Sequence, residues 1–356
     1  MTRVGVSFLA YPNLFGIKGL DFFYTKEVIG GEEGLKHIAR FVESFVSKSN
    51  EIWLVFQNEG VSLSKMVYTA EETRDITGDM REEKSRYVQV VRPSKWWYWL
   101  RTTDLGQKQM QDLLYQLLTA VKACHDRNIT HRDIKPENMI ICFEDIETGR
   151  CSREIPSEEK KKNLHMRLID FGSAIDDFTM KHLYGNGPTR SEQTFEYTPP
   201  EALLNNNWFR MPNDVRMKYD MWSIGVVMLE LMLGSPHVFQ LSSRTRALLD
   251  QQLEGWGEST RELAYKLRSY MELCILIPGI SSQHHQGSYA FDHSGASPAS
   301  WKCSEESFSQ QVKMRDPLNL GFSNIQALRL VRQLLVWHPE DRLTVDEALS
   351  HPYFKS

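Results

Sequence analysis

The sequence predicts an α+β fold with a short β-rich N-terminal part and a large, mainly helical remainder. Two strand-like runs at 39–46 and 51–57 flank the polar turn SKSN and predict an antiparallel hairpin. Between 107 and 128 apolar residues recur at steps of three and four, which predicts a long amphipathic helix. The segment 218–234 is apolar nearly all round and predicts a buried helix.

The composition is that of an ordinary globular protein. With 356 residues, 41% hydrophobic and 25% charged, the chain can form one large domain or two ordinary ones. The formal net charge of −4 gives no basic field, so no nucleic-acid partner is expected. No apolar run reaches the ~18 residues of a membrane span. Pro12 and Asn13 interrupt the N-terminal apolar stretch, which argues against a signal peptide.

The cysteines bear on the cellular compartment. They are odd in number, scattered, and contain no C-x-x-C pair: Cys124, Cys142, Cys151, Cys274 and Cys303. This pattern argues against a disulfide framework and indicates a reducing, intracellular location, most simply the cytoplasm.

Two further strands are expected at 138–142 and 165–172, on either side of a polar, charge-rich insertion. The segments 67–104 and 280–311 show little periodicity and are expected to be irregular.

Two helix starts are expected near the C-terminus. Ser323 with Gln326 and Thr344 with Glu347 each have the spacing of a capping box before an apolar helical pattern. The second half of the chain is therefore expected to be mainly helical.

The run KWWYWL contains Trp96, Trp97 and Trp99 and has two interpretations. Large amphipathic rings suit a partly solvent-exposed surface on which a partner docks. They also suit packing on the flank of the helical part, since aromatic side chains are usually buried.

The stretch ITHRDIKPENMIIC, residues 129–142, places an acid, two cations and an amide on one short loop. The acid is Asp133, and Lys135 and Asn138 follow within five positions. A carboxylate that receives a proton, an ammonium over a negative group, and an amide that helps to hold a metal together indicate phosphoryl transfer.

A second motif, LIDFGSA, places Asp170, Phe171 and Gly172 directly after a predicted strand. A carboxylate at a strand end suits a metal ligand, because the nearby glycine lets the backbone turn sharply. Further along come TFEYTPPEALL at 194–204, Asp220 in the buried helix, and Arg342 in WHPEDRLT.

In this order the motifs resemble the eukaryotic protein kinase superfamily, serine/threonine branch, across roughly 39–354. The resemblance implies a bilobal protein-kinase-like fold. Its abbreviated N-terminal lobe would cover 1–58 and its helical C-terminal lobe 59–356. Insertions would lie near 67–104, 143–164 and 236–316. The implied cofactors are ATP and Mg²⁺, and the implied partners are ATP and a protein substrate.

The resemblance also assigns roles within the site. Asp133 would accept the proton of the substrate hydroxyl, and Lys135 would lie over the transferred phosphoryl group and favour Ser/Thr substrates. Asn138 and Asp170 would hold two magnesium ions, alongside ATP. The residues with implied structural roles are His131, Phe171, Gly172, Glu201, Asp220 and Arg342.

Regulation is expected in the activation segment, 170–201. Arg132 would capture a phosphate there, and Thr189 and Ser191 are the expected phosphorylated residues. Thr194 is a weaker candidate, because the family uses that residue to hydrogen-bond the catalytic Asp and Lys.

The N-terminal part of the chain, where the family binds the nucleotide, departs from the family pattern. If Phe56 lies at the gatekeeper position of the family, the resemblance implies that Gln57, Asn58 and Glu59 form the adenine-binding hinge. Upstream, no G-x-G-x-x-G-x-V loop is recognisable, and no lysine lies in a V-A-I-K context. The N-terminal lobe is therefore abbreviated, divergent or incomplete. Three interpretations stay open: a Ser/Thr kinase, an inactive pseudokinase or scaffold, and a piece of a longer kinase.

Overall fold

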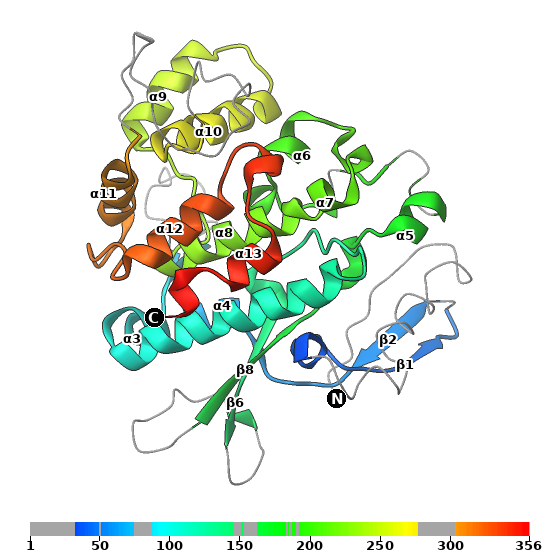
Figure 1. Cartoon of the computed structure of the whole chain (residues 1–356). Coiled ribbons are helices and arrows are strands. Elements are labelled where there is room, and N and C mark those ends of the chain that lie inside the picture. The colour runs from blue at the N-terminus through cyan, green and yellow to red at the C-terminus, as the bar shows by residue number, and fades with distance from the viewer. Residues whose placement is uncertain are drawn as a thin grey trace.

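The computed structural model describes residues 33–49, 51–74, 87–145, 151–152, 162–182, 184, 187–189, 192–276 and 303–355. The strands labelled in Figure 1 belong to small antiparallel sheets and lie on one side of a mainly helical body. In this view α9 (Ser243–Gln252) and α10 (Glu258–Glu272) lie at the end of the molecule opposite β6 (Met139–Asp145) and β8 (Lys162–Leu168).

The predicted N-terminal hairpin is confirmed. β1 (Phe41–Val46) pairs antiparallel with β2 (Ile52–Phe56), and the rings of Phe45 and Trp53 stack across the pair at 6.2 Å. The preceding 3-10 helix η1 (Glu33–His37) packs on the long helix α4 (Asp104–His125) and so connects the hairpin to the helical body.

The described parts of the segment 67–104, residues 67–74 and 87–104, are not irregular, so that prediction is wrong for them. β3 (Val61–Ser62) and α2 (Leu63–Val67) lead into a second hairpin of β4 (Tyr68–Arg74) and β5 (Tyr87–Pro93), which α3 (Lys95–Thr102) follows. The described side chains near the base of this hairpin are largely exposed, among them Thr69, Ala70 and Arg92. Strand residues that are exposed in this way need no apolar alternation, and periodicity therefore cannot reveal them.

The aromatic run lies on α3 and packs inward. Trp96 and Trp97 are buried, and the Trp97 Nε1–H donates to the Leu231 carbonyl at 2.7 Å. Trp99 is partly buried and packs against the same core. The docking interpretation is therefore wrong for Trp96 and Trp97, because the protein itself encloses both rings.

The two predicted long helices are confirmed. α4 (Asp104–His125) is amphipathic, and α8 (Lys218–Leu233) is buried along all its residues. Gly234 ends α8 with φ of 61°, a left-handed conformation that favours glycine, and its N–H donates to the Glu230 carbonyl at 2.8 Å.

The two predicted strands around the polar insertion are also confirmed. β6 (Met139–Asp145) pairs antiparallel with β8 (Lys162–Leu168), and β3 and the short β7 (Cys151–Ser152) pair with β6 as well. The register places Met139 opposite Leu168. The residues just before β6 and just after β8 therefore lie at the same end of this sheet.

The remaining helices complete the body. They are α5 (Asp177–His182), α6 (Pro200–Leu204), α7 (Asn213–Arg216), α9 (Ser243–Gln252), α10 (Glu258–Glu272), α11 (Glu305–Arg315), α12 (Ile325–Leu334) and α13 (Val345–Leu349). The 3-10 helices near the loop and the activation segment are η2 (Pro136–Asn138), η3 (Phe171–Ser173) and η5 (Phe195–Tyr197).

One predicted capping box is confirmed and the other is wrong. Thr344 and Glu347 cap α13 reciprocally. At α12 the cap is Asn324, whose side chain accepts from the Gln326 N–H at 2.8 Å. The Ser323 hydroxyl instead donates to Gln107 at 3.0 Å, so it is not available to the helix.

The prediction against disulfides is wrong. Cys142 is bonded to Cys151, Cys274 is bonded to Cys303, and Cys124 is free and buried. Pairing of β6 with β7 brings the first two thiols together, which linear spacing does not show. The cysteine-based argument for a reducing compartment therefore loses its support. No described helix is both long and apolar enough to cross a bilayer.

Candidate active site

The loop after α4 lies beside the chain that follows Gly172. Two backbone hydrogen bonds join Thr130 and Ile175, each N–H donating to the other residue's carbonyl at 2.9 Å. These bonds bring together the parts of the chain that carry Asp133 and Asp170, which are 37 positions apart.

Asp220 fixes the loop backbone from within α8. One carboxylate oxygen accepts from the His131 N–H at 2.8 Å, and the other accepts from the Arg132 N–H at 2.8 Å. His125 Nε2 lies 3.0 Å from the same carboxylate, which is completely buried. A buried carboxylate with these partners holds the loop rigidly against the helix.

His131 is a structural imidazole in this geometry. Its Nε2 lies 3.0 Å from the Ile169 carbonyl and its Nδ1 lies 3.3 Å from the Asp133 N–H. Only a neutral ring with the proton on Nε2 satisfies both contacts. Burial lowers the pKa of His131, which favours the neutral form, and the Phe171 ring packs against it at 4.6 Å. Neither nitrogen is therefore available as a base.

The Asp133 carboxylate is the centre of a dense polar cluster. Lys135 Nζ donates to it at 2.8 and 3.0 Å, and the Thr194 hydroxyl donates to it at 2.8 Å. Lys135 Nζ also donates to the Thr194 oxygen at 2.8 Å. The Asn138 amide donates at 2.8 Å to both the carboxylate and the carbonyl of Asp133. The loop and the activation segment thus converge on one acid.

Asn138 and Asp170 stand at the same end of the β6–β8 sheet. The Ile169 N–H donates to the Asn138 carbonyl at 2.9 Å, which joins the two backbones. Asp170 has φ of 66°, uncommon for a residue with a side chain, and its exposed carboxylate accepts from the Gly172 N–H at 3.3 Å.

These two side chains fit a magnesium ion that keeps water or phosphate in its other positions. Mg²⁺ prefers hard oxygen ligands and is usually bound through one or two protein groups plus substrate phosphates. Within the described ranges, no group of three or more His, Cys, Asp or Glu side chains could hold a metal by itself.

The expected hinge residues lie between β2 and β3. Gln57 and Asn58 are exposed, whereas the Glu59 side chain is 8% exposed. The Glu59 carboxylate pairs with Arg40 at 2.6 and 3.0 Å and also with Arg167. Across the described part of the chain, no hydrogen bond joins these three residues to the 129–138 loop.

Gly60 lets the chain cross β6 closely after the expected hinge residues. It has φ of 143°, and a Cβ at this position would lie 2.0 Å from the Ile141 carbonyl oxygen. Any side chain here would therefore push residues 57–59 away from β6.

Arg132 is enclosed at the base of the activation segment. Its Nη1 donates to the Ser173 carbonyl at 2.9 Å and lies 3.5 Å from Glu192 Oε2. Thr189 is exposed, and Ser191 lies outside the described residues. Glu192 had no signal in the sequence, because an acid in a loop is unremarkable until its partner is known.

The end of the activation segment is anchored by a buried ion pair. Arg342 donates to the two Glu201 oxygens at 2.8 and 3.0 Å. Its Nη1 also donates to the Lys218 carbonyl at 2.6 Å at the start of α8. The segment is thereby attached to both α8 and the C-terminal region.

Two buried titratable groups flank η5. Glu230 accepts hydrogen bonds from the hydroxyls of Tyr68 and Tyr197, and burial raises its pKa to about 8. On the other side Lys266 donates to the Phe195 and Glu196 carbonyls. Burial lowers the pKa of Lys266 to about 7. Sequence reasoning missed both, since each acts across a long chain separation.

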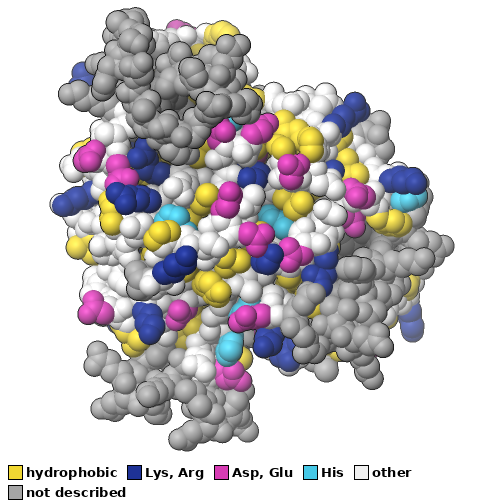
Figure 2. All heavy atoms as spheres, viewed as in Figure 1, with side chains coloured by type: hydrophobic (Ala, Val, Ile, Leu, Met, Phe, Trp, Pro, Cys, Tyr) yellow, Lys and Arg dark blue, Asp and Glu magenta, His cyan; other side chains and the backbone are white. Residues whose placement is uncertain are grey.

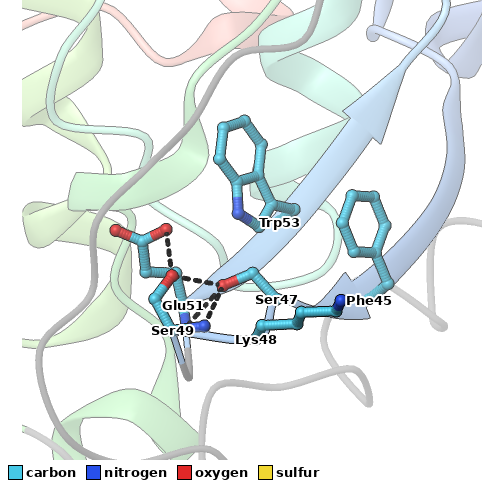
Figure 3. Close-up of a pocket in the computed structure, with 6 residues that line it drawn as sticks. All are labelled: Phe45, Ser47, Lys48, Ser49, Glu51 and Trp53. Carbon is cyan, nitrogen blue, oxygen red and sulfur yellow. Dashed lines mark hydrogen bonds between the residues drawn. The ribbon is translucent and has the colours of Figure 1, made fainter.

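The surface adds little to this centre. On the face in Figure 2, positive and negative side chains are interspersed. Figure 3 shows a hollow at the turn of the β1–β2 hairpin, lined by Phe45, Ser47, Lys48, Ser49, Glu51 and Trp53. None of its lining residues belongs to the 129–138 loop, so the chemistry is assigned by the polar cluster and not by this hollow.

Comparison with known proteins bears on the identity of this cluster. A family profile described as the protein kinase domain matches residues 75–354. The chain belongs to the protein kinase family. The matched region of this protein kinase contains the 129–138 loop, Asp170 and Arg342, and it begins after the expected hinge. The resemblance and the bilobal kinase-like fold are both confirmed.

Three relatives illustrate how similar this chain is in sequence to other proteins. A protein of Arabidopsis thaliana named a probable inactive protein kinase is 61% identical over 322 residues, which cover 90% of this chain and 85% of that protein. Serine/threonine-protein kinase Doa of Drosophila melanogaster is 30% identical over 250 residues, covering 69% of this chain and 26% of Doa. Extracellular signal-regulated kinase 1 of Candida albicans is 24% identical over 258 residues, covering 72% of this chain and 51% of its own length.

Proposed function

We propose that the chain is a protein serine/threonine kinase that transfers the γ-phosphoryl group of ATP to a protein hydroxyl. The observation that carries this proposal is the Asp133 carboxylate, which Lys135, Thr194 and Asn138 hold in one orientation. A carboxylate prepared in this way suits proton acceptance during in-line attack.

Each neighbour has a role in the proposed reaction. The substrate oxygen attacks the γ-phosphorus, its proton passes to an Asp133 oxygen, and ADP leaves. The Lys135 ammonium offsets negative charge on the phosphoryl oxygens. Asn138 and Asp170 would hold magnesium, which neutralises the phosphates when bound. His131 keeps the loop in place and takes no proton, because both its nitrogens are engaged.

The proposed lobes divide between residues 58 and 59. β1 and β2 pair with each other, whereas β3 pairs with β6 of the large sheet, which supports a boundary before β3. The backbone of Gln57, Asn58 and Glu59 would then receive the adenine. The helices α9 and α10 fall within the proposed insertion at 236–316.

A second candidate is an inactive kinase that serves as a binding module. It is supported by the name of the relative that is 61% identical and by a family match that begins only at residue 75.

Thermal unfolding with ATP and magnesium separates the candidates. A ligand that binds only the folded protein raises the melting temperature, by an amount that grows with ligand concentration. A rise that requires both ATP and Mg²⁺, together with radiolabelled phosphate transfer to a Ser/Thr substrate, would support the kinase. A chain that binds no nucleotide and transfers no phosphate would be the binding module.

A further inference from the structure

The guanidinium of Arg132 is buried but only partly paired. Its side chain is 0% exposed, and within the described residues its Nε and Nη2 have no hydrogen-bond partner. Two other buried arginines, Arg101 and Arg342, each have a carboxylate at hydrogen-bond distance. A buried cation with unmet donors favours a nearby anion strongly.

Glu192 is the acid in ion-pair contact with Arg132. Its Oε2 lies 3.5 Å from Arg132 Nη1, and its backbone carbonyl accepts from the Ser173 hydroxyl at 2.9 Å. Ser173 in turn accepts from Arg132 through its own carbonyl. Three residues from two parts of the chain therefore form a closed ring of contacts.

Two aromatic residues enclose this ring. Tyr184 lies beside it, and its pKa is raised first by burial and then by the negative charge of Glu192. The guanidinium carbon of Arg132 lies 5.6 Å from the centre of the Trp208 ring. The Arg132 side chain is fully buried, and a buried charge attracts its partner more strongly than a charge in water does, because the local dielectric constant is lower.

The ring touches both parts of the proposed reaction centre. Arg132 directly precedes Asp133, and Ser173 directly follows the Asp170–Gly172 turn. Glu192 lies two positions before Thr194, whose hydroxyl donates to Asp133 at 2.8 Å. A change at Glu192 therefore reaches the base through Thr194 and the metal-binding turn through Ser173.

We propose that Glu192 supplies, from within the chain, the anion that holds Arg132, so that the activation segment is positioned without phosphorylation. Glu192 is a positioning residue, since it acts through Arg132, Ser173 and Thr194. This differs from the expectation that phosphate on Thr189 or Ser191 fills the role. The effect on catalysis rests on the proposed kinase function, whereas the effect on the segment does not.

The first test measures order in the segment without any substrate. Amide hydrogen exchange over 192–198 would be compared in the phosphatase-treated parent, Glu192→Gln, and Asp177→Asn. Asp177 is the matched control, because its carboxylate also pairs with a buried arginine of this region, Arg216, at 3.3 Å, although it is more exposed than that of Glu192 (75% against 33%). We expect exchange about tenfold faster in Glu192→Gln alone, the order of effect for removing a charged partner from a buried group. The melting temperature of each variant establishes that it is folded.

The second test measures phosphate transfer. We expect Glu192→Gln to lower kcat about tenfold with little change in KM for ATP, as for an interaction that orients the reaction centre. Phosphatase treatment, or Ala at both Thr189 and Ser191, should leave kcat and exchange as in the untreated parent.

The outcomes are distinct. Parent-like exchange in folded Glu192→Gln would overturn the proposal, as would faster exchange after dephosphorylation alone. If the parent transfers no phosphate but Glu192→Gln exchanges faster, the kinase function fails and the role of Glu192 stands.

Discussion

At the scale of single residues, Asp133 is oriented before any substrate arrives, because three side chains hydrogen-bond to its carboxylate. We predict that Asp133→Asn lowers transfer to a Ser/Thr substrate by about 100-fold or more, the effect expected for loss of a positioned base. ATP affinity should be unchanged, since nucleotide binding does not require proton acceptance. Radiolabelled transfer and nucleotide titration on both proteins provide the test, and undiminished transfer would exclude Asp133 as the base.

A complementary prediction concerns Asp170 as a ligand of the proposed magnesium site. Asp170→Asn should abolish magnesium-dependent ATP binding while the melting temperature of the free protein stays the same, because the carboxylate is exposed and has one backbone partner. ATP titrations with and without Mg²⁺ measure the difference. Equal magnesium dependence in the two proteins would remove Asp170 from the metal site.

Glu230 makes stability depend on pH. Its pKa is raised from 4.5 to about 8, so the folded protein binds more protons than the unfolded chain between these values. Its contribution to stability is therefore fully present below pH 4.5 and is lost as pH rises to about 8. Denaturant unfolding between about pH 5 and pH 7 should show a steeper fall in unfolding free energy for the parent than for Glu230→Gln. Lys266, with its pKa lowered to about 7, is charged in both states over most of that range and adds little slope.

At the scale of secondary-structure elements, neighbouring residues of similar chemistry differ in whether they cap a helix. Thr344→Ala should lower the free energy of unfolding by about 1 kcal/mol, because Thr344 caps α13, and Asn324→Ala should do the same at α12. Ser323→Ala is the control and should have a smaller effect, since that hydroxyl bonds Gln107 instead. Equal losses at Ser323 and Asn324 would contradict the assignment of the α12 cap.

The sequence predicts those elements whose burial leaves a regular pattern of apolar residues, and those sites whose residues form a spaced motif. The β1–β2 hairpin, α4 and α8 each bury a defined surface, and their patterns predicted them. The β4–β5 hairpin escaped prediction because the described side chains near its base are largely exposed and leave no apolar period. The contact between Arg132 and Glu192 and the bond between Cys142 and Cys151 escaped because chain folding alone brings the partners together.

At the scale of the whole molecule, one buried ion pair joins distant parts of the chain. Arg101 of α3 donates to Asp316 at 2.9 Å, and Asp316 also accepts from the N–H groups of Leu318, Leu320 and Gly321. We predict that Asp316→Ala lowers the free energy of unfolding by about 3 to 5 kcal/mol, because it leaves the buried Arg101 guanidinium without its carboxylate partner. The combined Arg101→Met and Asp316→Ala protein should lose less than the sum of the single losses. Simple additivity in denaturant unfolding would show that the two residues do not interact.

The burial of α8 has a consequence for biosynthesis. This apolar helix lies in the middle of the chain, and part of its cover comes from residues made much later. At Gly225 an added Cβ would lie 2.8 Å from Leu335, so the α12 region packs directly on α8. Once α8 has left the ribosome, its apolar surface therefore stays exposed until roughly a hundred more residues emerge. A nascent chain in this state is prone to aggregation. Nascent chains stalled just after α8 has left the exit tunnel should recruit chaperones more strongly than chains stalled after α12 has left it.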